Sequence, residues 1–301
     1  MSTNEERREA AKRKLEERLE TERLARRKRK IVIASVSTAV VVAVVAGVTA
    51  VVVKKIMDDR EAARWTTCAY EDSPSRFDQL PDQVPDNVPA DQRAQYQAEL
   101  DELKAAAENE RTSPKPDERV LKSGTEKATF VTSQGTLPIT LERDGAPCNT
   151  AAVTSLIENK FYDDSTCHRM TTSETLKILQ CGDPTGTGMS GPGWTSPDEL
   201  PENLPSAGTD DDGVPQVTYP RGTVGILDLP DDEGATGSTT FFLLADDTDL
   251  PLTYSTVGTI DPSGLAVLDK VLAGGFTPNA PGAASGPPKQ NLLIQKATVG
   301  G

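Results

Sequence analysis

The chain has 301 residues, with 32 basic and 46 acidic side chains, and a formal net charge of −14 at pH 7. Residues 1–30 hold twelve of the basic and seven of the acidic side chains, so residues 31–301 hold 20 and 39 and carry a net charge of −19. A body this acidic excludes binding to nucleic acid through the phosphates, which requires a basic surface. Only 36% of the residues are hydrophobic, which indicates that part of the chain lies outside a folded core.

Residues 1–30 have the composition of a charged helix. Its apolar positions, Leu15, Leu19 and Leu24, form only a thin stripe. This pattern favours a solvated cytoplasmic segment that orients the chain over a helix that binds a partner.

Residues 31–53, IVIASVSTAVVVAVVAGVTAVVV, contain no charged side chain. A helix of this length spans the roughly 30 Å hydrocarbon layer of a bilayer, which predicts a single transmembrane helix. A cleaved signal peptide is the alternative, but its apolar region would be about 7–15 residues long and would end in small residues. Here Lys54 and Lys55 follow directly. The basic run at 25–30 predicts a cytoplasmic N-terminus and an extracytoplasmic C-terminal part in the cell membrane.

Residues 54–126 are predicted to form an extracytoplasmic stalk. The run SPSRFDQLPDQVPDNVPADQ (73–92) is rich in Pro and Asp, which favours extended or irregular backbone. Residues 90–108 contain good helix formers and predict a short helix. Residues 112–127 then return to the composition of a linker.

Residues 127–301 are predicted to be a mainly β domain. Residues 127–142 indicate a hairpin that turns at Ser133-Gln134-Gly135. Helices are expected over 146–161, with Pro147 near the start, and over 261–275. Further strand-like runs lie at 167–170, 176–181, 222–229, 239–245, 254–260 and 291–299. Many short strands and two helices far apart in the sequence predict a closed antiparallel barrel with helices at its ends.

The stretch TCHRMTTSETLKILQCGD (166–183) contains His168, the one histidine of the chain. A zinc site needs three or four ligands, and adjacent strand residues such as Cys167 and His168 point to opposite faces. The same alternation puts Cys167 and Arg169 on one face. We therefore expect no metal site and no Cys–His nucleophile, and we expect His168 to be hydrogen-bonded within the fold. The glycine-rich run 182–188 has no lysine for a phosphate and is expected to be a tight loop.

Four blocks of the sequence resemble those of cyclophilin-type peptidyl-prolyl isomerases. They are FYDDSTCHRM (161–170), ILQCGDPTGTGMSGPGW (178–194), PRGTVGIL (220–227) and TGSTTFF (236–242), of which the second is the most specific. The resemblance covers roughly residues 127–299, and the anchor-and-stalk layout is similar to that of membrane-anchored bacterial cyclophilins. It implies a closed eight-stranded antiparallel barrel capped by two helices.

The resemblance also implies an activity, the cis–trans isomerisation of X–Pro bonds in secreted or envelope proteins. The barrier, ~18–20 kcal/mol, comes from the partial double bond of the amide. An apolar pocket that grips the proline and a fixed guanidinium at the prolyl nitrogen suffice, without a nucleophile, metal or cofactor. Arg169 matches the family's catalytic arginine, and Gln180 matches the glutamine that positions the arginine and the substrate. Phe242 matches the floor of the proline pocket, and Gly188 the loop lining the neighbouring pocket.

Other pocket positions depart from the family pattern. Where the family has Met-Ala-Asn, this chain has Ile226-Leu227-Asp228, and the family's substrate-binding glutamine is replaced by Thr240. The family's pocket histidine corresponds to Tyr254, and its tryptophan falls at Asp249 or Leu250. The phenylalanine that faces the proline falls near Leu176 or Lys177, beside Ile178. Asp228 and Asp249 are expected to place negative charge near Arg169. The resemblance thus gives as substrate-binding candidates Phe242, Gly188, Ile178, Leu227, Asp228, Thr240, Leu250 and Tyr254.

All four cysteines lie on the predicted outer side of the membrane, where disulfides persist. Four cysteines allow three connectivities, and the count alone does not choose among them. From count and compartment we expect Cys148, Cys167 and Cys181 to lie close together in the barrel with one pair bridged. Cys68 is then the remaining partner and clamps the stalk.

Two functions from different classes follow. The retained Arg169, Gln180 and Phe242 favour an isomerase, with activity weakened by the altered pocket, that acts on proline-containing segments of secreted or envelope proteins. The substitutions at Thr240, Tyr254 and Asp249 favour a non-catalytic cyclophilin-like module that binds peptides or envelope proteins. A structural envelope protein, in which the stalk and acidic surface matter more than the groove, is the third alternative.

Overall fold

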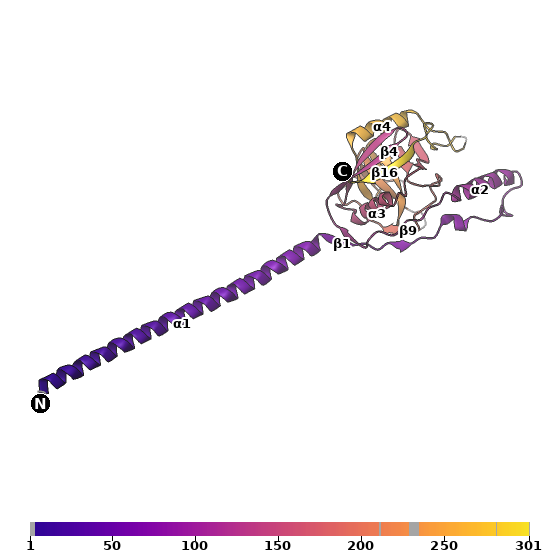
Figure 1. The fold of residues 1–301 in the computed structure, drawn as a ribbon. Helices are drawn as coiled ribbons and strands as arrows, with labels where there is room; N and C mark the ends of the chain where they lie inside the picture. The colour runs from indigo at the N-terminus through magenta and orange to yellow at the C-terminus, as the bar shows by residue number, and fades with distance from the viewer. Residues whose placement is uncertain (1–3, 211, 229–234, 281, 301) are drawn as a thin grey trace. The chain divides into compact units, whose positions relative to one another are not determined.

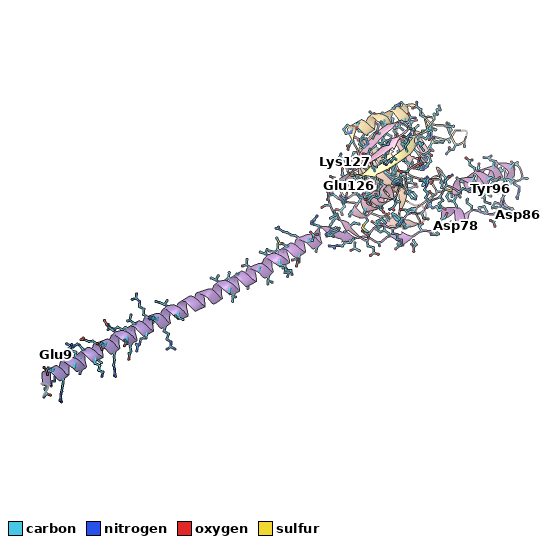
Figure 2. The ribbon with its side chains drawn as sticks, viewed as in Figure 1. Glu9, Asp78, Asp86, Tyr96, Glu126 and Lys127 are labelled. Atoms are coloured by element: carbon cyan, nitrogen blue, oxygen red, sulfur yellow. A yellow bond between two sulfur atoms is a disulfide. The ribbon has the colours of Figure 1, made fainter. Side chains whose placement is uncertain are left out.

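The computed structural model describes residues 4–210, 212–228, 235–280 and 282–300, which fall into two units divided between Ala63 and Arg64. The first unit is one helix, α1 (Asn4–Ala63) (Figure 1). Its described side chains are exposed to solvent, whereas the second unit has a core of buried side chains (Figure 2).

A search of the described residues for a helix long and apolar enough to cross a membrane finds none. The anchor expected at residues 31–53 includes residues 33–41, whose side chains lie outside the described part of the chain.

The second unit is built on a curled sheet of eleven strands in the described part of the chain. Nine of them follow one another in the order β2-β9-β13-β12-β15-β5-β4-β16-β6, and β8 and β7 continue from β13. The strands are β2 (Glu71–Asp72), β4 (Thr125–Thr132), β5 (Gly135–Glu142), β6 (Ser165–Thr166), β7 (Arg169–Thr172), β8 (Lys177–Cys181), β9 (Trp194–Pro197), β12 (Thr223–Asp228), β13 (Ala235–Leu244), β15 (Thr256–Ile260) and β16 (Leu293–Val299).

The hairpin predicted at residues 127–142 is confirmed by β4 and β5, which pair from Thr125↔Glu142 to Thr132↔Gly135. Gly135 has φ +139°, a backbone conformation that favours glycine. Alternate residues of the two strands, among them Phe130 and Ile139, are buried in the core. The period of two in the sequence therefore gives the inward face of the sheet.

The two helices predicted for the domain are also confirmed. They are α3 (Pro147–Glu158) and α4 (Pro262–Ala273), which lie on either side of the sheet in Figure 1. Each begins with a proline, whose missing N–H loses no helical hydrogen bond at that position. Their buried faces, with Leu156 on α3 and Leu268 on α4, join the main core.

The prediction of a closed eight-stranded barrel is wrong, because the sheet stays open between β6 and β7. β6 pairs with β16, whereas β7 pairs with β8. Between them the chain changes partner: Cys167 N donates to Leu292 O (3.0 Å) and His168 N donates to Gln180 O (3.1 Å). Cys167 thus still bonds on the β16 side and His168 already on the β8 side, so β6 and β7 do not pair with each other and the described strands form a curled half-barrel.

Much of the predicted stalk is folded onto the domain. The compact unit begins at Arg64 instead of at residue 127. β1 (Trp65–Thr67) pairs with β3 (Arg119–Leu121), and β2 pairs with β9. Cys68 and Tyr70 are buried in the main core. The short helix predicted over 90–108 is confirmed as α2 (Arg93–Ala107), which follows a 3-10 turn, η1 (Arg76–Gln79).

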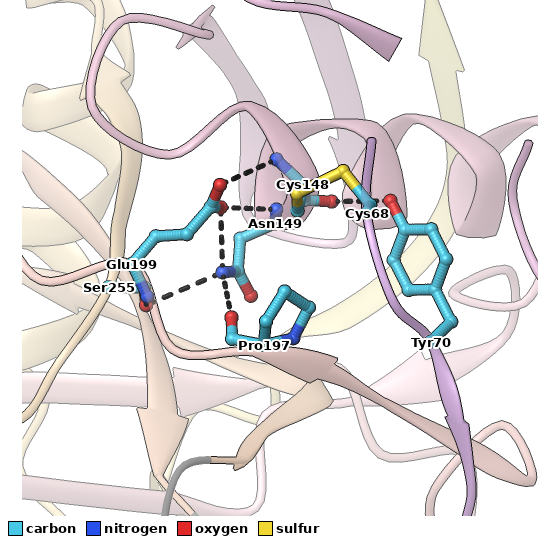
Figure 3. Close-up of a disulfide and its surroundings, with 7 residues drawn as sticks. All are labelled: Cys68, Tyr70, Cys148, Asn149, Pro197, Glu199 and Ser255. Carbon is cyan, nitrogen blue, oxygen red and sulfur yellow. Dashed lines mark hydrogen bonds between the residues drawn. A yellow bond between two sulfur atoms is a disulfide. The ribbon is translucent and has the colours of Figure 1, made fainter. Parts of the chain in front are cut away.

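Two disulfides, Cys68–Cys148 and Cys167–Cys181, account for all four cysteines. Cys68 holds the N-terminal segment to the start of α3, as expected for a clamp (Figure 3). Beside it Tyr70 donates a hydrogen bond to Cys148 O (2.9 Å) and packs edge-on against Trp194, with ring centroids 5.5 Å apart. The segment before the sheet is therefore fixed by a covalent bond and by aromatic packing.

Candidate active site

The strands β7, β8 and β13 separate two apolar clusters. Leu179, Phe241 and Leu243 point into the main core. Their neighbours Phe242 and Leu244 belong to a smaller second cluster. Because successive strand residues point to opposite faces, the second cluster lies on the outer face of the curled sheet.

Arg169, Gln180 and Phe242 form one row on this outer face. Gln180 is the Cα partner of Arg169 on β7 and of Phe242 on β13. Residues directly opposite one another on antiparallel strands project from the same face. The structure therefore brings together the guanidinium, the amide and the aromatic ring that the sequence singled out.

The half-buried Arg169 is held at one end of its guanidinium. Its Nε donates to Ser285 Oγ (3.2 Å), and the described residues provide no ion pair or further hydrogen bond for its terminal amino groups. The acidic partner expected at Asp249 is not found, because that carboxylate accepts a hydrogen bond from Thr218 Oγ1 (2.6 Å). Asp228, the other expected partner, has its side chain outside the described part of the chain.

Phe242 is fully buried, and its ring takes up the space beside a glycine. Gly225 is its Cα partner on β12, and a Cβ at that position would stand 2.1 Å from Phe242 Cζ. The ring of Tyr254 meets that of Phe242 edge-on, with centroids 5.3 Å apart. The ring that is expected to form the floor of the proline pocket is therefore buried, with Tyr254 packed against it.

The second cluster gathers most of the expected substrate-binding residues. Ile178, Leu227, Leu250 and Tyr254 all belong to it or pack against it. Thr240, which is buried two residues before Phe242 on β13, shares the outer face.

A three-stranded sheet missed by the sequence analysis contributes to the same cluster. It consists of β10 (Ser206–Thr209), β11 (Pro215–Tyr219) and β14 (Thr248–Pro251). Val217 and Tyr219 on β11 are buried in the cluster, and Tyr219 Oη donates to the carbonyls of Pro251 and Tyr254 (3.3 Å each). Burial raises the pKa of Tyr219 to about 12. The hydroxyl therefore stays protonated at neutral pH and helps to fix the position of Tyr254.

The glycine-rich loop 182–193 is organised by Asp183. The fully buried carboxylate accepts hydrogen bonds from Thr185 N (2.7 Å), Thr187 N (3.1 Å), Gly188 N and Ser190 Oγ. Burial raises the pKa of Asp183, but the hydrogen bonds from Ser190 and Thr185 outweigh it, so the pKa lies below its ordinary value. The tight loop expected from the sequence is confirmed, and its central carboxylate was not foreseen.

Gly188 contacts His168 in this structure. Its φ is +81°, and a Cβ there would stand 3.0 Å from His168 Nε2, so the position requires glycine. We expected the His168 side chain to be hydrogen-bonded within the fold. Its buried Nδ1 atom, however, has no hydrogen-bond partner among the described residues. Burial lowers the pKa of His168, Asp183 raises it and Arg169 lowers it further, with a net decrease.

Strand alternation predicted that Cys167 and Arg169 would lie on the same face. This prediction is wrong, because Cys167 points into the main core and Arg169 lies on the outer face. Cys167 is bonded to Cys181, the neighbour of Gln180. The change of partner between Cys167 and His168 breaks the alternation. The disulfide leaves no thiolate at this position for a metal or a nucleophilic attack.

Glu199 caps the N-terminus of α3, a role that the sequence analysis missed. Its carboxylate accepts from Cys148 N (3.0 Å), Asn149 N (2.8 Å) and Asn149 Nδ2 (2.9 Å) (Figure 3). Burial raises the pKa of Glu199 above its ordinary value. Ser255 Oγ accepts from Glu199 N (2.9 Å) and lies 3.4 Å from Asn149 Nδ2. The cap thus connects the Cys68–Cys148 end of α3 with the residue that follows Tyr254.

The sequence model of the family "cyclophilin type peptidyl-prolyl cis-trans isomerase/CLD" matches residues 127–299. This range is more than half of the chain, and the chain therefore belongs to this family.

Two curated mycobacterial proteins, each named a probable peptidyl-prolyl cis-trans isomerase B, are similar to this chain. The protein from Mycobacterium tuberculosis is 38% identical over 165 residues, which cover 55% of this chain and 51% of that protein. The protein from Mycobacterium leprae is 38% identical over 173 residues, which cover 57% and 56%. The chain thus spans about half the length of the curated relatives it matches.

Solved structures show more distant likenesses. A cyclophilin type isomerase from Cryptosporidium parvum, determined in the presence of the dipeptide Ala-Pro, is 19% identical with a TM-score of 0.43, over 58% of this chain and 99% of that chain. Cyclophilin AquaCyp293 from Hirschia baltica is 19% identical with a TM-score of 0.39, over 65% and 78%.

Proposed function

We propose that this chain catalyses the cis–trans isomerisation of X–Pro peptide bonds. The observation that carries the proposal is the row of Arg169, Gln180 and Phe242, in which the terminal amino groups of the guanidinium have no partner among the described residues. Family membership and the two probable isomerases at 38% identity support it.

The row supplies what the reaction needs. Rotation about an X–Pro bond requires loss of amide conjugation, at a cost of ~18–20 kcal/mol. A donor at the prolyl nitrogen favours the twisted, unconjugated amide, and the guanidinium of Arg169 donates without ever losing its charge. Gln180 beside it offers an amide donor and acceptor to the peptide backbone. The apolar cluster around Phe242 and Tyr254 is the surface proposed to receive the proline ring, once Tyr254 moves off Phe242.

The test is an isomerisation assay on an X–Pro peptide with the full chain purified in its oxidised form. Arg169→Ala is expected to lower kcat/KM by about 100-fold, because a charge-assisted hydrogen bond worth ~1.5–3 kcal/mol in the transition state is lost. Arg76→Ala, in η1, is the matched control and is expected to keep the wild-type rate. Equal rates for wild type and Arg169→Ala would contradict the mechanism.

A non-catalytic binding module is the second candidate, and one observation favours it. Phe242 is fully buried, and Tyr254 packs on its ring. A proline reaches the ring only if Tyr254 moves, so catalysis through this pocket is expected to be weaker than through an open one. A folded wild type that binds proline peptides without accelerating their isomerisation would establish this alternative.

We propose further that the chain is anchored in the cell membrane by residues 31–53, with its C-terminal part outside. The uncharged run, the basic residues at 25–30 and the two disulfides support this placement. Proline-containing segments of secreted or envelope proteins are then the substrates within reach. Protease added to intact cells should digest residues 64–301 and spare residues 1–30, and protection of both parts would contradict the topology.

A further inference from the structure

Arg169 has one side-chain partner in the described part of the chain, and it comes from a distant segment. Arg169 Nε donates to Ser285 Oγ at 3.2 Å, across 116 residues of sequence. Ser285 lies between α4 and β16, outside every block that carries the family resemblance.

The segment that contains Ser285 is fixed against β7. Met170 N donates to Gly286 O (2.8 Å), and Gly286 N donates back to Met170 O (3.1 Å). Thr171 Oγ1 also donates to Ala284 O (3.0 Å). Both backbone neighbours of Ser285 are therefore bonded to residues that directly follow Arg169 on β7.

On another side, Gly286 lies close to the segment that follows α4. A Cβ at position 286 would stand 1.9 Å from Thr277 O, so only glycine fits between the two backbone segments. The Ser285 hydroxyl is consequently held at a defined place beside the arginine.

The position of the hydrogen bond on the guanidinium matters chemically. Arginine has five N–H donors in one rigid plane, and its flexible stem otherwise allows that plane to turn. A bond at Nε fixes the plane and leaves the terminal amino groups to a substrate. We infer that Ser285 is a positioning residue, which orients Arg169 toward the prolyl nitrogen; the inference rests on the isomerase function proposed above.

The kinetic test is Ser285→Ala in the full oxidised chain. We expect kcat to fall about tenfold with KM within about twofold of wild type, because a misdirected guanidinium weakens the transition state more than the ground state. Ser285→Thr keeps a hydroxyl and is expected to retain most of the rate. Thr171→Val is the matched control: it removes the bond to Ala284 O from the same segment and leaves the Ser285 hydroxyl in place.

A spectroscopic readout separates this inference from the proposed function. The ¹⁵Nε–¹H signal of Arg169 in the protein without substrate should shift, and its proton should exchange faster with water, in Ser285→Ala and not in Thr171→Val. An unchanged signal together with an unchanged kcat would overturn the positioning role. Equal losses of kcat in Ser285→Ala and Thr171→Val would also overturn it, since anchoring of the segment would then explain the effect.

Failure of the proposed function has a different signature. A folded wild type without isomerase activity would remove the catalytic role of Ser285, whereas the Arg169 signal would still respond to Ser285→Ala. A shifted signal with a tenfold lower kcat supports both proposals.

Discussion

Gly225 and Phe242 face each other across β12 and β13, and the aromatic ring lies where a side chain at position 225 would have to be. Gly225→Ala should therefore displace the ring, lower the free energy of unfolding by about 1–3 kcal/mol and reduce isomerase activity. Urea unfolding and the peptide assay measure the two effects. Gly191→Ala, at a position with open space around it, should change neither, and a Gly225→Ala variant as stable and active as wild type would refute the packing argument.

His168 makes stability depend on pH in a predictable direction. Its pKa is lowered in the folded protein, chiefly by burial. As the pH falls below the unfolded value of about 6.5, the unfolded chain takes up a proton that the folded chain does not. The free energy of unfolding should therefore decrease with falling pH in this window, by at most ~1.4 kcal/mol per pH unit.

The check is urea unfolding of wild type and His168→Gln from about pH 7 to pH 5. The variant should lack most of the slope near the unfolded histidine pKa. Asp183, whose folded pKa is lowered, loses its contribution only at more acidic pH, as the pH falls through that folded value. The raised pKa of Glu199 acts in the opposite direction, because its folded form keeps a proton at pH values where the unfolded form has lost it. Identical slopes for wild type and variant would show that His168 does not titrate as inferred.

Among the elements, the two disulfides should differ in their effect on stability. Cys68–Cys148 closes a loop of 80 residues and Cys167–Cys181 one of 14. In the chain-entropy description, the loss of the longer link costs about 4.5 kcal/mol and that of the shorter about 3 kcal/mol. Unfolding of the double Cys→Ser variants measures both losses, and a larger effect for the 14-residue loop would mean that native contacts, rather than loop length, set the order.

The sequence predicted the elements with strong periodicity and missed those without it. The hairpin β4–β5 and the helices α3 and α4 follow from alternating or helical apolar positions. β10 has four exposed residues, SAGT, and β2 has two, ED, so their pairing depends on neighbouring strands that no local pattern reveals. The contacts of residues 64–126 with the core were not foreseen for the same reason, since single buried residues such as Tyr70 are spaced too widely to form a pattern.

For the site, the sequence blocks singled out the residues that form the row on the outer face of the sheet, but not the residues that hold them. Arg169, Gln180 and Phe242 lie in recognisable blocks and form one row. Ser285 and Glu199 act on residues 116 and 50 positions away, and nothing local to either marks that role. Gly225 differs from these two residues, because a glycine inside a strand often indicates that another group packs closely against the backbone, as Phe242 does here.

At the scale of the whole molecule, residues 64–126, which were expected to form a stalk, belong to the second compact unit. Arg64 already belongs to the compact unit, and the segment from residue 64 to 126 returns to it at β1, β2 and β3. Ser73 N donates to Gly193 O and Ser113 N donates to Pro192 O, so the two ends of segment 74–112 are held at the same loop.

The disulfide pattern also bears on how the chain is made. Its cysteines appear during synthesis in the order 68, 148, 167 and 181, and the native bridges join the first to the second and the third to the fourth. At ~5–20 residues per second, Cys68 waits roughly 4–16 s for Cys148 and then has a single partner for about 1–4 s before Cys167 follows. Pairing each cysteine with the first one available thus gives the native connectivity, so the order of synthesis itself disfavours the other two arrangements.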